Sequence, residues 1–137
     1  MPEERFDVRL DVDAEKEYNR LDGSVLGMVN IAIDELIFRA DEVGKTLSNY
    51  SETKLAGCKE IKLRDAGIRI VFRVTNEIVD ILQIVYVLTI ERRTRDMAFK
   101  TAHGRLKVYR KLTKDQVRLL HEKQKKWPIK KKPDGKL

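Results

Sequence analysis

Residues 59–74 read KEIKLRDAGIRIVFRV, two apolar, β-branched runs separated by the turn signal Asp65-Ala66-Gly67. A second turn signal at 75–77 leads into another long apolar run, whose apolar side chains fall on both faces of a pleat. Connections this short favour an antiparallel meander, and the last strand is expected to be central and covered on both sides. The predicted strands are 59–63, 68–75 and 78–90.

The N-terminal third predicts one strand and a helical hairpin. Residues 5–12 alternate polar and apolar side chains, which indicates a strand with one buried face. Asp13 is expected to cap a first helix that ends near Asp22-Gly23. Ser24 is expected to cap a second helix, whose apolar residues recur at helical spacing. Two helices joined by so short a turn pack antiparallel.

Signals for regular structure are weaker elsewhere. Residues 43–53 are expected to form a loop, and Asp96 to cap a short helix that stops at Gly104. One more helix is predicted at 114–121. The lysine-rich end with Pro128 and Pro133 is expected to be disordered.

Together these elements predict an α+β fold. Its order is an N-terminal strand, an antiparallel helical hairpin, a three-stranded antiparallel meander and short C-terminal helices. Residues 1–112 are assigned to this domain, and residues 113–137 to a C-terminal helix and tail.

The net charge of +7 is unevenly divided along the chain. Residues 1–42 hold five Lys and Arg against twelve Asp and Glu, a balance of −7. Residues 43–120 carry +9 and residues 121–137 carry +5. This asymmetry predicts one acidic and one basic face, which is typical of proteins that bind nucleic acid. A solvated surface is the simpler interpretation of the acidic third.

Composition excludes several classes of function. No apolar run approaches twenty residues, and the charged N-terminus is unlike a signal peptide, so a soluble, cytoplasmic protein without a membrane partner is expected. The single Cys58 has no Cys or His at ligand spacing and is expected to be a half-buried structural thiol. No metal site and no cofactor are predicted.

A specific resemblance rests on residues 55–72, LAGCKEIKLRDAGIRIVF, followed by an apolar strand and Glu91-Arg92-Arg93-Thr94-Arg95-Asp96. These motifs, and the order of the elements over about residues 5–106, resemble the RelE/ParE superfamily of toxins from toxin-antitoxin systems. The RelE branch cleaves mRNA in the ribosomal A site. The resemblance therefore implies the ribosome and mRNA as partners, and a cognate antitoxin that silences the toxin in a hetero-oligomer.

The resemblance also implies roles for basic residues. Cleavage in the RelE branch uses the ribose 2′-hydroxyl as nucleophile, needs no metal, and leaves a 2′,3′-cyclic phosphate and a 5′-hydroxyl. Fixed cations would stabilise the charge on the pentavalent phosphorus. The implied catalytic residues are Lys62, Arg64, Arg69 and Arg93. The implied RNA contacts are Arg73, Arg92, Arg95, Lys100 and Arg105.

Two positions depart from the RelE pattern. Glu60 stands where that branch often has a Lys; it either repels phosphate, supplies a carboxylate base or simply faces solvent. Phe99 replaces a Tyr, so it can stack on a base but has no proton to give. His103 would share a helical face with Phe99 and suits acid–base work, although a surface or capping role is the simpler interpretation.

Alternatives remain open at this point. Arg73 and Arg64 could pair with Asp80, Asp96 or Glu91 across strands, as ordinary surface charges. A ParE-like inhibitor of DNA gyrase would need no convergent cations, and a degenerate RelE fold would bind without cleaving. Trp127 and the C-terminal lysines could contact ribosomal RNA or merely solubilise the chain.

Overall fold

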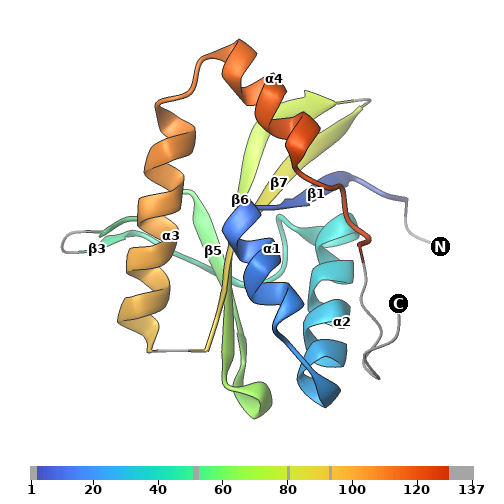
Figure 1. Ribbon diagram of the computed structural model, residues 1–137, viewed down its shortest axis with the longest axis vertical. Coiled ribbons are helices and arrows are strands. Elements are labelled where there is room, and N and C mark those ends of the chain that lie inside the picture. Colours follow the sequence, from blue (N-terminus) through green and yellow to red (C-terminus); the bar gives the residue numbers. More distant parts are fainter. Residues whose placement is uncertain (1–2, 51–52, 80, 93, 130–137) are drawn as a thin grey trace.

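The computed structural model describes residues 3–50, 53–79, 81–92 and 94–129, and at Tyr50 it describes the backbone only. Within these residues five strands form one mixed sheet in the order β1-β7-β6-β5-β2. Helices α1 and α2 cover one face of this sheet and α3 covers the other (Figure 1). The elements are β1 (Phe6–Leu10), α1 (Val12–Asn19), α2 (Gly23–Arg39), β2 (Lys45–Thr46), β3 (Asn49–Tyr50), β4 (Thr53–Lys54), β5 (Cys58–Leu63), η1 (Arg64–Ala66), β6 (Ile68–Val79), β7 (Leu82–Glu91), α3 (Arg95–Arg110) and α4 (Lys114–Lys123).

The α+β class and the antiparallel meander β5–β6–β7 are confirmed. β7 is interior, with β1 parallel on one side and β6 antiparallel on the other. Its residues from Ile84 to Glu91 are all buried, so the prediction of a central strand covered on both faces is also confirmed.

The predicted helix starts are each two residues too late. Asp11 caps α1, since its Oδ1 accepts hydrogen bonds from the amides of Asp13 and Ala14. Likewise α2 begins after Asp22 without a side-chain cap, and Thr94 caps α3. The predicted caps Asp13, Ser24 and Asp96 therefore lie inside first turns.

Two predicted stops are also wrong. α1 ends at Asn19 rather than near Asp22-Gly23. α3 continues through Gly104 to Arg110, because later residues such as Leu106 bury their side chains against the sheet. Packing of this kind outweighs the roughly 1 kcal/mol that a helical glycine costs.

The predicted turn at 75–77 lies inside β6. Thr75 donates its hydroxyl hydrogen to the carbonyl oxygen of Ile84 (2.8 Å), and a register irregularity between Val74 and Ile78 absorbs the polar residues. The hairpin instead turns near Ile81, whose φ is +66°. The predicted loop at 43–53 holds the short strand β2, which pairs with β5, and part of the β3–β4 hairpin.

The helix predicted at 114–121 is confirmed as α4. The predicted disorder after it is wrong for the residues up to Ile129, which are ordered in the structure. Trp127 is 1% exposed, and its Nε1 donates to Asp34 (2.9 Å). Its ring meets that of Tyr18 edge-on, and its amide donates to the carbonyl of Val8 (2.8 Å). The prediction that Trp127 is exposed and available for stacking on RNA is therefore wrong. Residues 130–137, with Lys130, Lys131 and Lys132, lie outside the described residues.

Candidate phosphate-binding site

A pocket of about 280 Å³ opens between the β5–β6 turn and the start of α3. It gathers three of the four predicted catalytic cations, together with Arg95 from the predicted RNA set. Arg93 lies outside the described residues. The lining residues are Lys62, Leu63, Arg64, Gly67, Ile68, Arg69, Thr94 and Arg95.

Strand register explains why these cations converge. Lys62 on β5 lies directly opposite Arg69 on β6. Between them the chain makes a single 3₁₀ turn that ends at Gly67, whose φ of +65° other residues rarely adopt. This tight return keeps Arg64 at the same end of the hairpin.

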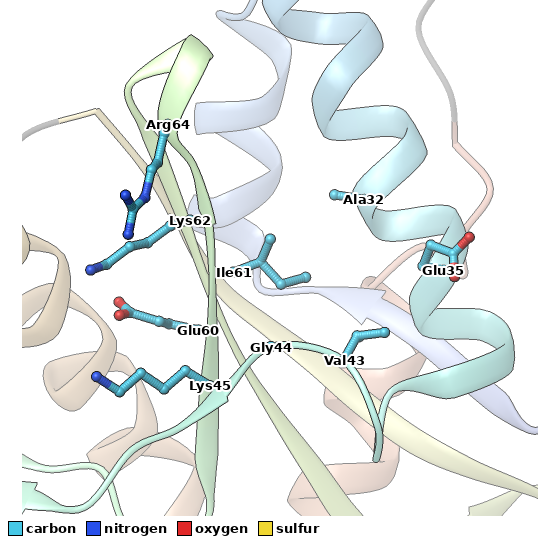
Figure 2. Close-up of a pocket in the computed structure, with 9 residues that line it drawn as sticks. All are labelled: Ala32, Glu35, Val43, Gly44, Lys45, Glu60, Ile61, Lys62 and Arg64. Carbon is cyan, nitrogen blue, oxygen red and sulfur yellow. The ribbon is translucent and has the colours of Figure 1, made fainter.

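A second cavity, of about 560 Å³, lies beside the first, and Lys62 and Arg64 line both. Figure 2 shows Lys45, Glu60, Lys62 and Arg64 pointing to the same side of β5, with Glu60 between the two lysines. Ile61 points to the other side, toward α2. The charged side chains therefore leave β5 on the side away from α2, and Ile61, Ala32 and Val43 supply the apolar lining on the α2 side.

Glu60 is buried, with 3% exposure, and its Oε2 lies 3.4 Å from Nη1 of Arg69. Lys45 on β2 lies opposite Glu60 in the strand register. The interpretation of Glu60 as a solvent-facing strand residue is therefore wrong. Its burial beside cations is consistent with the rule that a buried charge requires partners.

The ring of Phe99 is not available to stack on an RNA base. Its side chain is 5% exposed within the core between α3 and the sheet, and the guanidinium of Arg95 lies 5.1 Å from the ring centroid. The stacking role considered for Phe99 is therefore wrong in this structure, because core atoms and Arg95 occupy its surroundings.

His103 has a structural contact. Its Nδ1 accepts a hydrogen bond from the amide of Lys54 (3.0 Å), which ties α3 to β4. This geometry favours the capping role over the acid–base role for His103.

Among the predicted RNA contacts, Arg105 is the one that the structure contradicts most clearly. Its side chain is 17% exposed and forms an ion pair with Glu17 (2.8 Å) and a longer one with Asp11 (3.7 Å). Burial opposes the charged form, but the hydrogen bonds and charge of Glu17 outweigh it and raise the pKa of Arg105. Arg105 therefore belongs to the scaffold rather than to an RNA surface.

The remaining predicted RNA contacts do not form one surface. Arg73 donates to the carbonyl of Ala56 (3.4 Å) and lies against the loop at Gly57. Arg92 lines a different hollow, with Glu17 and Arg20 on the α1 side. Lys100 is exposed on α3. An ion pair across strands forms at Arg69, for which none was predicted, and its partner is Glu60.

Sequence reasoning missed Lys45 and Thr94. Lys45 reaches the site because β2 pairs with β5, and Gly44 allows this approach: a Cβ there would lie 2.8 Å from the Glu60 carbonyl oxygen. A glycine followed by a lysine after a helix was the available signal. Thr94 enters as the cap of α3, which places it at the pocket.

Other groups can be placed briefly. Cys58 is a free, fully buried thiol rather than a half-buried one, and burial raises its pKa. Among the described residues, no three His, Cys, Asp or Glu side chains gather as a metal-binding group. Nor does any helix in the described part of the chain combine the length and apolar character needed to span a membrane.

The helical hairpin and α3 on opposite faces of a mixed sheet, with cations at the β5–β6 turn, define a small α+β fold. A double-substituted E. coli RelE toxin in the free state matches with a TM-score of 0.55 and 22% identity, over 80% of this chain and 100% of that chain. The isolated E. coli RelE toxin in a P21 crystal form matches with a TM-score of 0.47 and 21% identity, over 78% and 99%. The first of these two matches shows that the chain has a RelE-like toxin fold. No protein-family model matches the sequence, and no curated protein matches it significantly.

Proposed function

We propose that this protein is a RelE-like toxin that cleaves mRNA on the ribosome and is neutralised by a cognate antitoxin. The observation that carries the proposal is the convergence of Lys62, Arg64, Arg69 and Arg95 on one pocket of about 280 Å³. Cations from separate elements that meet at one cavity are suited to a phosphodiester and its developing charge.

In the proposed reaction the ribose 2′-oxygen gives up its proton and attacks the adjacent phosphorus, the bond from phosphorus to the 5′-oxygen breaks, and the departing 5′-oxygen takes a proton from water. The products are a 2′,3′-cyclic phosphate and a 5′-hydroxyl. Lys62, Arg64 and Arg69 stabilise the pentavalent transition state, and each such contact contributes about 3–4 kcal/mol in comparable sites.

Glu60 is assigned as the proton acceptor for the 2′-hydroxyl. Of the three acid–base or stacking candidates, Phe99 has no group that transfers protons and His103 engages the Lys54 amide. Glu60 lines the adjoining cavity between Lys45 and Lys62 (Figure 2). A carboxylate at that place can take a proton while the neighbouring cations bind the phosphate.

The test combines growth and product chemistry. Induction of the parent protein is expected to arrest growth, and ribosomes programmed with mRNA should yield fragments with 2′,3′-cyclic phosphate ends. Arg69→Ala and Arg93→Ala should each abolish arrest while remaining folded by circular dichroism. Intact mRNA in the presence of folded parent protein would refute the nuclease proposal.

A second candidate is a RelE fold that binds without cleaving. The ion pair between Glu60 and Arg69 favours it, because it engages one of the pocket's cations with a carboxylate. This candidate predicts that the parent protein binds ribosomes or an antitoxin but leaves mRNA intact. A ParE-like gyrase inhibitor is less favoured, because inhibition by binding does not require a cationic pocket.

A further inference from the structure

The end of β7 extends past its neighbour β1. The parallel pairing stops at Leu10 opposite Val87, after which the chain turns into α1. The amide of Asp11 makes the last such contact, donating to the carbonyl of Val87 (2.9 Å). From Leu88 onward, no described strand pairs with β7 on this side.

Two side chains occupy the place of the missing strand. Arg105 of α3 donates from Nη1 to the carbonyl oxygen of Leu88 (2.8 Å). Glu17 of α1 accepts a hydrogen bond from the amide of Ile90 (3.1 Å). Leu88 and Ile90 are buried, so these backbone groups need partners, and the two side chains supply them.

Glu17 and Arg105 also hold each other. The guanidinium donates from Nη1 to Oε1 (2.8 Å) and from Nη2 to Oε2 (3.1 Å), a two-point contact that fixes both orientations. Thr89 donates its hydroxyl hydrogen to the same Oε1 (2.9 Å). We call the Glu17–Arg105 pair with its bonds to Leu88, Thr89 and Ile90 the β7 clasp.

The β7 clasp holds the strand that leads into the connector from β7 to α3. Ile90 lies one residue before β7 ends, and Arg105, ten residues after the start of α3, ties that helix to Leu88 of the same strand. The connector carries Arg92 and Thr94 and enters α3 at Arg95. Thr94 and Arg95 line the cationic pocket, whereas Glu17 and Arg105 do not.

We propose that Glu17 and Arg105 are positioning residues that fix the β7–α3 connector and thereby place the pocket's α3-side groups. The catalytic part of this inference rests on the proposed function. The positional part does not, because it concerns the mobility of the connector. This partly buried two-point ion pair joins α1 to α3 and is bonded to the end of β7, the strand that leads into the connector.

The structure offers a matched control. Asp7 is buried and accepts two hydrogen bonds from Arg9 (both 3.1 Å), and Arg9 in turn donates to the carbonyl of His121. This pair also ties the sheet to a helix, but through α4 and away from the connector. Asp7→Asn therefore removes a comparable charge without touching the β7 clasp.

Amide hydrogen exchange on the full-length protein tests the positional part. Glu17→Gln should accelerate exchange at Ile90, Arg92 and Thr94 by about tenfold or more relative to the parent. Asp7→Asn should leave those amides at the parent rate. Unchanged exchange in Glu17→Gln, or equal acceleration in both variants, would overturn the inference. If Glu17→Gln does not fold, Thr89→Val, which removes one donor to Glu17, should show a smaller acceleration at the same amides.

Cleavage on programmed ribosomes tests the catalytic part. Glu17→Gln should lower kcat by about 100-fold with KM within about twofold, because cations a fraction of an ångström out of place stabilise the transition state poorly. Asp7→Asn should change neither. A normal kcat in a variant with accelerated exchange would remove the catalytic role. A parent that does not cleave mRNA would defeat the proposed function, while the exchange experiment would still decide the positional role.

Discussion

The carboxylate of Glu60 on β5 lies 3.4 Å from the guanidinium of Arg69 on β6, so a residue of the adjoining cavity contacts one that lines the proposed cleavage pocket. The Glu60 side chain is 2% exposed and the Arg69 side chain 24% exposed. A guanidinium has five N–H donors, so this contact orients Arg69 and leaves donors that can bind phosphate. The same carboxylate also lowers the positive potential that attracts RNA.

These two roles of Glu60 predict opposite effects on binding and on chemistry. Glu60→Gln should bind mRNA-programmed ribosomes more tightly, because a negative charge beside the pocket is removed. It should cleave more slowly, by about 100-fold, because the proton acceptor is lost. Single-turnover cleavage and a binding titration measure the two effects separately.

Glu35 provides the control for Glu60. It lines the same cavity of about 560 Å³ from α2, and it pairs with Arg39. Glu35→Gln removes the same charge but should leave the single-turnover rate unchanged. Normal cleavage by Glu60→Gln would rule out a proton-acceptor role.

Lys62 and Arg64 should separate activity from stability. Both side chains are exposed, so alanine at either position should change the free energy of unfolding by only about 0.5 kcal/mol. Each should lower kcat by about 100- to 1,000-fold if it stabilises the transition state. Urea denaturation and cleavage assays measure the two quantities.

Lys59 is the matched control for these two substitutions. It lies on the other pleat face of β5 and donates to the carbonyl of Asp41 (2.9 Å). Lys59→Ala should keep full cleavage activity. A loss equal to that of Lys62→Ala would mean that general positive charge, rather than the pocket, matters.

Local periodicity was enough to predict the order of the main elements, because each buries one face or both. It placed the helix starts two residues late in three cases. Each case offered two polar residues separated by one position, as at Asp11 and Asp13, and both are acceptable caps by composition. At Asp11 the earlier residue follows directly on the end of β1 at Leu10, and residue preference cannot reveal where that strand ends.

The candidate site was partly predictable for a related reason. Lys62 and Arg69 could be placed because a hairpin register follows from a short turn. Lys45 could not, since its position depends on the pairing of β2 with β5 across a stretch that resembles a loop. The burial of Phe99 and Trp127 likewise depends on tertiary contacts between distant segments.

Trp127 is expected to be essential for stability. Trp127→Ala should cost about 3–5 kcal/mol, because a fully buried aromatic ring is removed from between α1, α2 and β1. Trp127→Phe keeps much of the ring but loses the hydrogen bond to Asp34, and should cost less. Equal losses in both variants would indicate that the Asp34 bond, not packing, dominates.

The C-terminal lysines can be tested without disturbing that core. Deletion must begin after Ile129, because a larger truncation would remove Trp127. Deleting residues 130–137 should leave the unfolding midpoint unchanged. If Lys130, Lys131 and Lys132 contact ribosomal RNA, the slope of log affinity against log salt should become shallower by up to about 0.7 per lost contact. An unchanged slope would assign these lysines to solubility alone.

His121 should make stability depend on pH. Burial lowers its pKa below the ordinary 6.5, as does the nearby charge of Arg9, while Glu77 and Asp7 act in the opposite direction. Its Nε2 is hydrogen-bonded to the hydroxyl of Tyr86, which ties α4 to β7. Because the folded protein holds this proton less tightly than the unfolded chain, the unfolded state is favoured as pH falls below about 6.5. The free energy of unfolding should therefore drop more between pH 7.5 and pH 5.5 in the parent than in His121→Gln. Parallel pH profiles for the two proteins would show that His121 is not the titrating group.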